Sequence, residues 1–349
     1  MANQKHNQLR KQIAPYEKSN TKESVWQLIN TLVPFFALWI LAYVSLSVSY
    51  LLTFVICAVA AGFLVRIFII FHDCCHQSFF KNRRVNQIIG TITGVMTFCP
   101  YEQWKHSHSV HHATSSNLNK RGTGDVWVLT VDEYNASSFW RKLAYRLYRN
   151  PFVMFVLGPI YIFLIDYRFN EKDARMKERL NTYLTNLLIV VTIAILCWTI
   201  GWQAFLLIQG PIFLISGSIG IWLFYVQHQF EDSYFENEEE WDYVKAALEG
   251  SSYYKLPKVL QWLTGNIGFH HIHHLSPRVP NYKLEEVHNN HQALQEVQTI
   301  TIGSSLKSLR FRLWDEKNKK FIGFKDLKNE QVKPVVKRTT VSASMKSDL

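Results

Sequence analysis

Two long stretches of the chain are strongly apolar and contain no charged residue. They cover residues 25–65 and 183–230, and small or polar residues interrupt each one near its middle. A helix needs roughly 20 apolar residues to cross the hydrocarbon core of a bilayer, so each stretch is long enough for two helices. We therefore predict two transmembrane hairpins that turn at residues 45–49 and 201–203, in preference to buried helices of a soluble fold.

Two shorter apolar stretches, residues 85–100 and 151–165, contain glycine and proline and are short for a span. If residues 85–100 alone crossed the membrane, the histidines near residue 72 and those near residue 110 would lie on opposite faces of it. Crossing by the second alone would move the basic segment 168–179 to the outer side. We predict interfacial or re-entrant helices here, and additional paired spans are the alternative.

Lysine and arginine residues flank the apolar stretches but are absent from both predicted turns. By the positive-inside rule the turns lie outside, and both termini and the polar remainder of the chain face the cytoplasm. This pattern predicts a multi-pass protein of the plasma membrane. The formal net charge of +11 suits contact with anionic lipid headgroups or an acidic partner protein. It does not by itself indicate nucleic-acid binding.

Thirteen of the fourteen histidines follow residue 65, and most of them form three clusters. Residues three or four positions apart project from one face of a helix. His72 and His76 have this spacing, and the triplets that begin at His108 and His270 repeat it as i, i+3, i+4. One further histidine ends the second apolar stretch on the same side of the membrane. Together these are nine candidate metal ligands: His72, His76, His108, His111, His112, His228, His270, His273 and His274.

Nine imidazoles exceed what one metal ion accepts. They suit two ions with four or five protein ligands each and with positions left open for oxygen. Imidazole binds zinc, copper, iron and nickel, and the lack of a converging cysteine set argues against a structural zinc or an iron–sulfur site. Two neighbouring ions with open positions favour redox chemistry with O2, so iron is the first choice and zinc the second.

Four acidic residues near the clusters could orient ligands by accepting the second ring N–H. Taken individually, each is expected to be an ordinary exposed carboxylate. These residues are Asp73, Glu102, Asp125 and Asp232.

Other residues within or near the clusters are expected to play no part in metal binding. His106 and His271 fall outside the repeated spacing and should point elsewhere. Cys74 and Cys75 should serve as small apolar filler. Three further histidines are expected at the surface: His6, His288 and His291.

The predicted fold class is therefore an all-α integral membrane protein. It has two helical hairpins (four spans) and a cytoplasmic helical cap that holds a histidine-rich site for two metal ions. The predicted divisions are a cytoplasmic tail over residues 1–24, a membrane domain over 25–325, and a polar, disordered cytoplasmic tail over 326–349.

The three clusters resemble the histidine boxes of integral-membrane fatty acid desaturases, which are written HxxxH, HxxHH and HxxHH. The matching segments are residues 72–76, 104–112 and 268–274. The similarity extends through the flanking residues 113–118 and 120–125 and covers about residues 25–325. Within that family the chain most resembles the cold-induced acyl-lipid Δ5 desaturases of bacteria.

The resemblance implies a non-haem di-iron centre, with His228 as the ninth ligand and with O2 as co-substrate. It implies formation of a cis double bond in saturated acyl chains of membrane phospholipids, with no catalytic residue beyond the metal ligands. Electrons should come from a separate ferredoxin or flavodoxin, because the sequence has neither a fused cytochrome b5 signature nor a glycine-rich nucleotide-binding fingerprint.

Two other functions stay open at this point. One is a membrane di-iron hydroxylase of alkyl or carotenoid chains, because related histidine boxes support oxygen insertion. The other is a non-catalytic, metal-binding membrane transporter or sensor. Transport would require ionisable residues deep within the spans, whereas the histidines lie where the spans leave the membrane.

Overall fold

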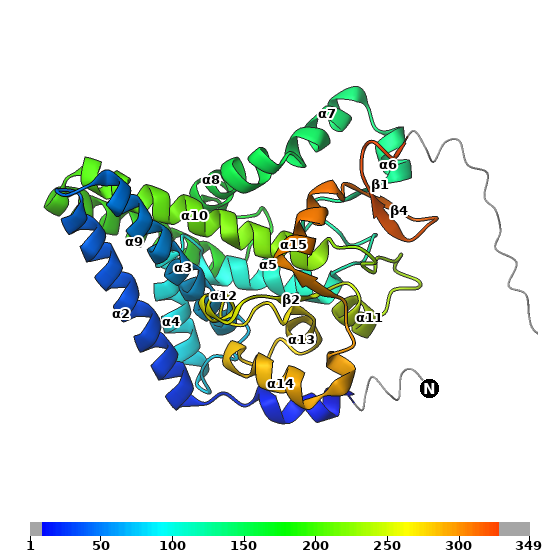
Figure 1. The fold of residues 1–349 in the computed structure, drawn as a ribbon, viewed down its shortest axis with the longest axis horizontal. Helices are drawn as coiled ribbons and strands as arrows, with labels where there is room; N and C mark the ends of the chain where they lie inside the picture. The colour runs from blue at the N-terminus through cyan, green and yellow to red at the C-terminus, as the bar shows by residue number, and fades with distance from the viewer. Residues whose placement is uncertain (1–8, 328–349) are drawn as a thin grey trace, which may run out of the picture.

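The structure is a computed structural model that describes residues 9–327, and it consists mostly of helices (Figure 1). The α-helices are α2 (Thr21–Ser45), α3 (Tyr50–Cys75), α4 (Arg83–Met96), α5 (Tyr101–Thr114), α6 (Val131–Ala136), α7 (Phe139–Tyr148), α8 (Gly158–Leu164), α9 (Met176–Ile200), α10 (Trp202–His228), α11 (Tyr243–Leu248), α12 (Lys258–Leu263), α13 (His270–Leu275), α14 (Leu284–Asn290) and α15 (Ile302–Ser305). Shorter 3-10 or π-helical turns are η1 (Ala14–Glu17), η2 (Val153–Leu157), η3 (Asp166–Arg168), η4 (Asn281–Lys283), η5 (Gln292–Leu294) and η6 (Leu306–Arg310). The strands are β1 (Leu129–Thr130), β2 (Tyr253–Lys255), β3 (Thr299–Thr301), β4 (Leu313–Asp315) and β5 (Lys320–Ile322).

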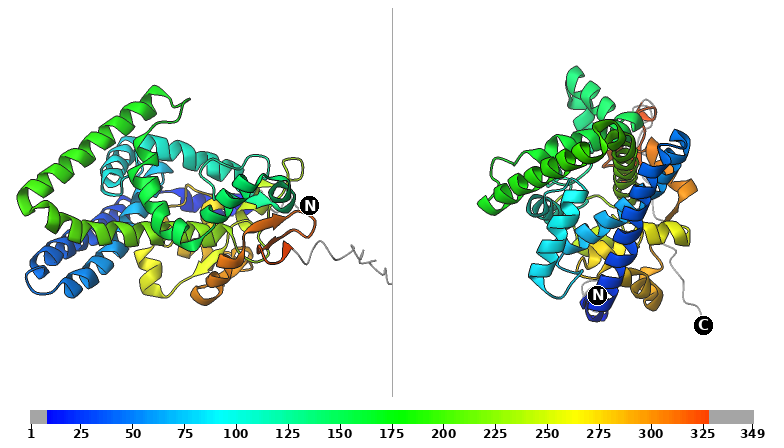
Figure 2. Two further views of the ribbon diagram at one scale, coloured as in Figure 1. Left: turned by 90° about the horizontal axis from the view of Figure 1, so that it is seen from above. Right: turned by 90° about the vertical axis from the view of Figure 1, so that its left-hand side faces the viewer.

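Four of the described helices are long and apolar enough to cross a membrane: α2, α3, α9 and α10. Residues 46–49 join the first pair, and Gly201 alone joins the second. Gly201 has a φ of +85°, a conformation that glycine adopts without steric cost. The two predicted hairpins and both predicted turns are therefore confirmed. Figure 2 shows these long helices on one side of the molecule and the shorter elements on the other.

The two shorter apolar stretches do not form straight spans. The first contains α4, which has only 14 residues and packs beside α3 and α9. The second lies mostly in the helical segment Val153–Arg168, which is bent by 67° from the preceding α7. This geometry fits a broken or re-entrant helix.

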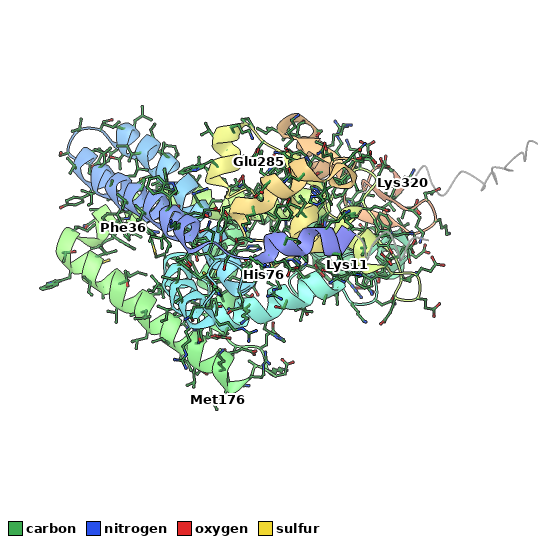
Figure 3. All side chains as sticks on the ribbon, turned by 90° about the horizontal axis from the view of Figure 1, so that it is seen from below. Lys11, Phe36, His76, Met176, Glu285 and Lys320 are labelled. Carbon is green, nitrogen blue, oxygen red and sulfur yellow. The ribbon has the colours of Figure 1, made fainter. Side chains whose placement is uncertain are left out.

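The surface changes character between the two halves of the molecule. On the hairpins, large apolar side chains are exposed; Phe36 on α2 is 51% exposed. Such a surface suits lipid rather than water. Lys11, Glu285 and Lys320 lie on the other half, which carries the short helices and strands (Figure 3). The predicted tails over residues 1–24 and 326–349 reach into residues 1–8 and 328–349, which lie outside the described residues.

A buried arginine joins the first hairpin to the polar half of the molecule. Arg66 of α3 is 6% exposed, and its Nε donates to Thr31 Oγ1 at 3.0 Å. The guanidinium also donates to the carbonyl of Trp262, at the end of α12, and lies 4.0 Å from the centre of the Trp262 ring. These contacts fix the segment that leads from α12 to α13.

Candidate metal centre

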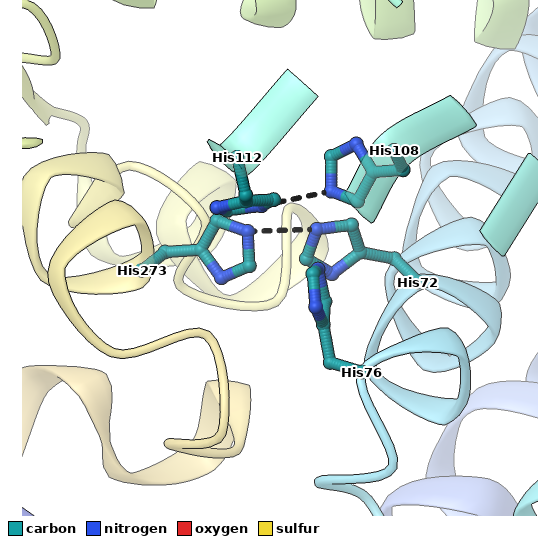
Figure 4. Close-up of side chains that lie close together, drawn as sticks. All are labelled: His72, His76, His108, His112 and His273. Carbon is teal, nitrogen blue, oxygen red and sulfur yellow. Dashed lines mark hydrogen bonds between the residues drawn. The ribbon is translucent and has the colours of Figure 1, made fainter. Parts of the chain in front are cut away.

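All nine candidate ligands converge at the junction of the spans and the polar half. α3 ends beside His72 and His76, and α10 ends at His228. α5 and α13 bring the two triplets alongside. The first histidine group consists of five residues whose ligand nitrogens all lie within 4.8 Å of one another (Figure 4): His72, His76, His108, His112 and His273.

The second histidine group lies directly beside the first. His111, His228 and His274 each offer a nitrogen within 4.8 Å of the others. His270 joins them, because its Nε2 is 2.9 Å from Nε2 of His228. The imidazole rings of His112 and His274, one from each group, stack with centroids 4.2 Å apart. The nine histidines therefore form a group of five and a group of four.

The arrangement of ring protons in the second group fits a bound cation. His111 Nδ1 faces Asp125 Oδ1 at 2.5 Å, and His228 Nδ1 faces the carbonyl oxygen of Gly250 at 3.2 Å. Both partners can only accept, so in neutral rings the proton sits on Nδ1 and leaves a lone pair on Nε2. These two Nε2 atoms face each other at 3.2 Å. Neither can donate to the other, whereas two nitrogens each about 2.1 Å from one metal ion would lie at about this separation.

Other ring nitrogens in the two groups also lack a protein partner. Two Nε2 atoms, those of His76 and His274, are buried without a hydrogen bond. Nδ1 of His112 and of His270 is also buried without a partner, but it lies on the far side of a ring whose Nε2 faces another histidine. A buried polar atom without a partner is costly unless an ion or another group contacts it. The histidine set therefore fits two metal ions.

Burial keeps six of the candidate ligands outside the spans neutral, as metal binding requires. Desolvation lowers the pKa of His108, His112 and His273 well below the usual value, and neighbouring imidazoles lower it further. The pKa of His76, His270 and His274 falls for the same two reasons. A neutral imidazole offers a lone pair to a metal, whereas an imidazolium offers none.

The expectation that Asp73 is an ordinary exposed carboxylate is wrong. Its side chain is buried, and its Oδ1 lies 3.0 Å from Nδ1 of His72. Its Oδ2 accepts hydrogen bonds from the backbone N–H and the side-chain amide of Asn281, at 2.6 and 2.8 Å. Asp73 thus orients a candidate ligand and connects α3 to the loop after α13. Such carboxylate partners set the orientation and basicity of metal-binding imidazoles.

The same expectation is wrong for Asp125, whose side chain is 16% exposed and contacts His111. The remaining two acids lie apart from the histidines. Glu102 is buried and pairs with Lys177 at 2.8 Å, and Asp232 lies exposed in the loop after α10. The position of Asp73 directly after His72 in the sequence could have indicated that it orients this histidine. The spacing of Asp125 in the sequence gave no indication that it contacts His111.

The histidines set apart by their spacing do point elsewhere. His106 lies exposed beside Arg175, and His271 donates from Nε2 to the carbonyl of Leu294 at 3.0 Å. His288 and His291 lie at the surface as half-buried residues. His288 packs against Tyr253, Phe269 and His271. His6 lies outside the described residues.

The neighbouring cysteines and an aromatic ring complete the surroundings. Cys74 and Cys75 are buried in an apolar cluster, as expected for filler. Trp104 stacks on the ring of His108, with centroids 4.2 Å apart. This stacking covers one face of the His108 ring, and both residues line a cavity beside the histidines.

A cavity of about 710 Å³ opens beside the histidines. His72 and His108 of the first group and His270 of the second contribute to its wall. From there it extends between α3, α8 and α10 and is lined mainly by apolar side chains such as Phe68 and Leu223. An apolar molecule inside it would therefore reach both histidine groups.

Comparison with known proteins gives a consistent set of matches. Residues 47–304, which contain all nine histidines, match the model of the fatty acid desaturase family. A fatty acid desaturase of Bacillus subtilis is 68% identical over 325 residues, which are 93% of this chain and 92% of that protein. The chloroplastic omega-6 fatty acid desaturase of Brassica napus is 28% identical over 66% of this chain and 51% of its own length. The sn-1 oleoyl-lipid 12-desaturase of a Synechocystis species is 26% identical over 64% of this chain and 63% of its own length.

Proposed function

The chain belongs to the fatty acid desaturase family, and from this premise we propose that it forms a cis double bond at carbon 5 of saturated phospholipid acyl chains. It is a membrane enzyme of the acyl-lipid desaturase type. The cavity carries the rest of the proposal, because it leads from the membrane-spanning helices to both histidine groups. An acyl chain of a lipid in the same bilayer can enter it without crossing water.

The five histidines of the first group would hold one iron ion and the four of the second group another, and histidines of both groups line the cavity. When bound, the two irons and O2 supply the oxidising power. Two hydrogens leave neighbouring methylene groups, two electrons and two protons are added, and the products are an alkene and two waters. Asp73 and Asp125 contact Nδ1 of His72 and His111, which would leave the Nε2 atoms of both rings free to bind metal.

The cavity wall positions the acyl chain for this reaction. Phe68 of α3 and Phe224 of α10 line it near the histidines, and such apolar walls keep water away from the reacting carbons. Holding the chain in one register makes a single pair of methylenes the target, which is the main contribution that a protein makes beside a reactive cofactor. The position at carbon 5 rests on the similarity to bacterial Δ5 enzymes.

The histidine groups and both termini face the cytoplasm, and the enzyme resides in the plasma membrane. The support is the absence of lysine and arginine from the two hairpin turns and their abundance elsewhere. Electrons come from a separate reduced ferredoxin or flavodoxin on that side, where the net charge of +11 attracts an acidic carrier. A reporter fused at residue 47 should read as external and one fused at residue 175 as cytoplasmic; the reverse pattern would refute this orientation.

The reaction is tested by expressing the full chain in a host that makes no acyl chains unsaturated at carbon 5. Mass spectrometry of the phospholipids should locate a cis double bond at that carbon, and its formation should stop without O2 or without reduced ferredoxin or flavodoxin. A double bond at another carbon would refute only the position. Hydroxylated chains without an alkene would indicate the hydroxylase instead, and zinc in the protein without any lipid product would indicate a transporter or sensor.

A further inference from the structure

The cavity follows one face of α10 from the histidines into the membrane-spanning part of the molecule. Its wall includes Gln227, next to His228, and Phe213, which lies fourteen positions earlier on the same helix. A helix rises 1.5 Å per residue, so the cavity accompanies α10 over roughly 21 Å. Between these two ends the wall residue that lies nearest the middle is Gly220.

Gly217 also lines the cavity, and the packing of α8 against α10 explains it. A Cβ atom at Gly217 would lie 2.8 Å from Cβ of Pro159 on α8, so a larger residue cannot fit there without movement. Gly158 on α8 lines the cavity too, but a Cβ atom there would make only an ordinary van der Waals contact, 3.4 Å from Cδ1 of Ile221 on α10. Gly217 therefore allows the two helices to approach each other.

Gly220 has no such packing reason. A Cβ atom added there would meet no atom within 4 Å, so the missing side chain leaves open space at a residue that lines the cavity. Glycine is less favourable than alanine inside a helix because it has more backbone freedom to lose. A glycine that no neighbour requires, in the wall of a substrate cavity, indicates that the space itself is used.

The position of Gly220 along the helix identifies the part of the substrate that uses this space. Phospholipid headgroups stay at the membrane surface, and the histidine groups lie at the end of α10, which is His228. Gly220 lies eight positions before it, roughly 12 Å deeper along the helix axis. The acyl carbons that pass Gly220 are therefore those beyond the reacting pair, toward the methyl end.

We propose that Gly220 determines how long an acyl chain the enzyme accepts, by leaving room for the methyl-end segment beyond the new double bond. This inference rests on the proposed desaturase function. Any side chain at this position would project into the cavity and shorten it, while the histidine groups some distance away would be unaffected. The substrate class that the open space favours is the longer saturated chains of membrane lipids.

The test uses Gly220→Leu and the smaller change Gly220→Ala in the full-length enzyme. Each variant is expressed in a host whose phospholipids contain saturated chains of 14, 16 and 18 carbons, and the unsaturated products are measured by mass spectrometry. The ratio of 14-carbon to 18-carbon products should rise on the order of tenfold in Gly220→Leu, since a pocket discriminates by about this factor per methylene that no longer fits. Gly220→Ala should shift the ratio in the same direction by less.

Gly210→Leu is the matched control, because Gly210 lies on the same helix and a Cβ atom there also meets no atom within 4 Å. Gly210 directly precedes Pro211, and a residue before proline is restricted in conformation. Leu207→Phe, on the exposed side of α10, therefore serves as a second control. Both should keep the wild-type ratio. If the Gly220→Leu variant has normal abundance and iron content, an unchanged product ratio would overturn the inference. If Gly220→Leu does not accumulate, an unchanged ratio in Gly220→Ala would overturn it instead. Failure of the wild-type enzyme to form any double bond would instead refute the proposed function.

Discussion

Replacing His273 by alanine should abolish double-bond formation and lower the iron content of the purified protein. His273 Nε2 lies 3.0 Å from Nε2 of His72 and belongs to the group of five. Its loss removes a ligand and leaves the remaining buried nitrogens without a partner, and a metal with fewer ligands is held less tightly. Double-bond formation in the expression host and iron per chain are the two measurements. The same result is expected for each of the other eight candidate ligands.

His106→Ala is the matched control for this prediction. His106 lies on α5, between Trp104 and the candidate ligand His108, yet its ring is exposed and contacts Arg175. Its replacement should leave both iron content and turnover close to those of the wild-type protein. Full activity in two or more of the nine ligand variants would contradict the ligand assignment.

His271→Ala separates a structural role from metal binding. Burial lowers the pKa of His271 to about 3, and its Nε2 donates to Leu294 rather than facing either histidine group. Its replacement leaves a buried carbonyl without a donor, which costs about 1–3 kcal/mol of folding free energy. The protein should therefore melt at a lower temperature but keep its iron.

Asp73→Asn should lower iron affinity and turnover by about 10- to 100-fold, the usual cost of losing a carboxylate that orients a metal-binding histidine. An asparagine of the same shape cannot supply the negative charge that faces His72 Nδ1, and its amide group would face one of the donors that now bind Asp73. Iron affinity, measured by competition with a chelator, is the informative quantity because a purely structural role would leave it unchanged in the folded protein.

Glu102→Gln is the control for Asp73. Glu102 is another buried acid and lies on α5, which carries one histidine triplet, but it pairs with Lys177, which is largely exposed, instead of a ring nitrogen. Ion pairs with one exposed partner contribute little to stability, so both iron affinity and turnover should stay near the wild-type values. Equal losses in the two variants would show that Asp73 acts through general stability and not through His72.

The membrane part of the fold could be predicted because its causes are local in the sequence. Uncharged runs long enough for two spans predicted α2, α3, α9 and α10. Small and polar residues predicted the second turn, where Gly201 adopts a conformation that favours glycine. The short parallel pairing of β1 with β4 could not be predicted, because it joins residues 129 and 313. Its partners are chosen by tertiary packing rather than by local propensity.

The candidate ligands could also be predicted, but not their division between two ions. The i, i+3, i+4 spacing places His108, His111 and His112 on one face of a helix. In the structure, His108 and His112 join the first group, whereas His111 joins the second. Spacing fixes which side chains share a face, but the partner helices decide which of them meet.

The role of Asp125 and the course of the cavity could not be predicted from the sequence, because both depend on how distant segments pack together. Asp125 reaches His111 from a loop fourteen residues away in the chain, and no helical periodicity links the two residues. The cavity wall combines α3, α5, α8 and α10. The space at Gly220 becomes visible only when these helices are placed side by side.

If the two histidine groups hold two iron ions, metal analysis of the purified full-length protein by mass spectrometry should find two irons per chain. The iron content should be lower when a member of either group, His76 or His274, is replaced by alanine. Zinc in place of iron, or iron content unchanged in both variants, would contradict this assignment.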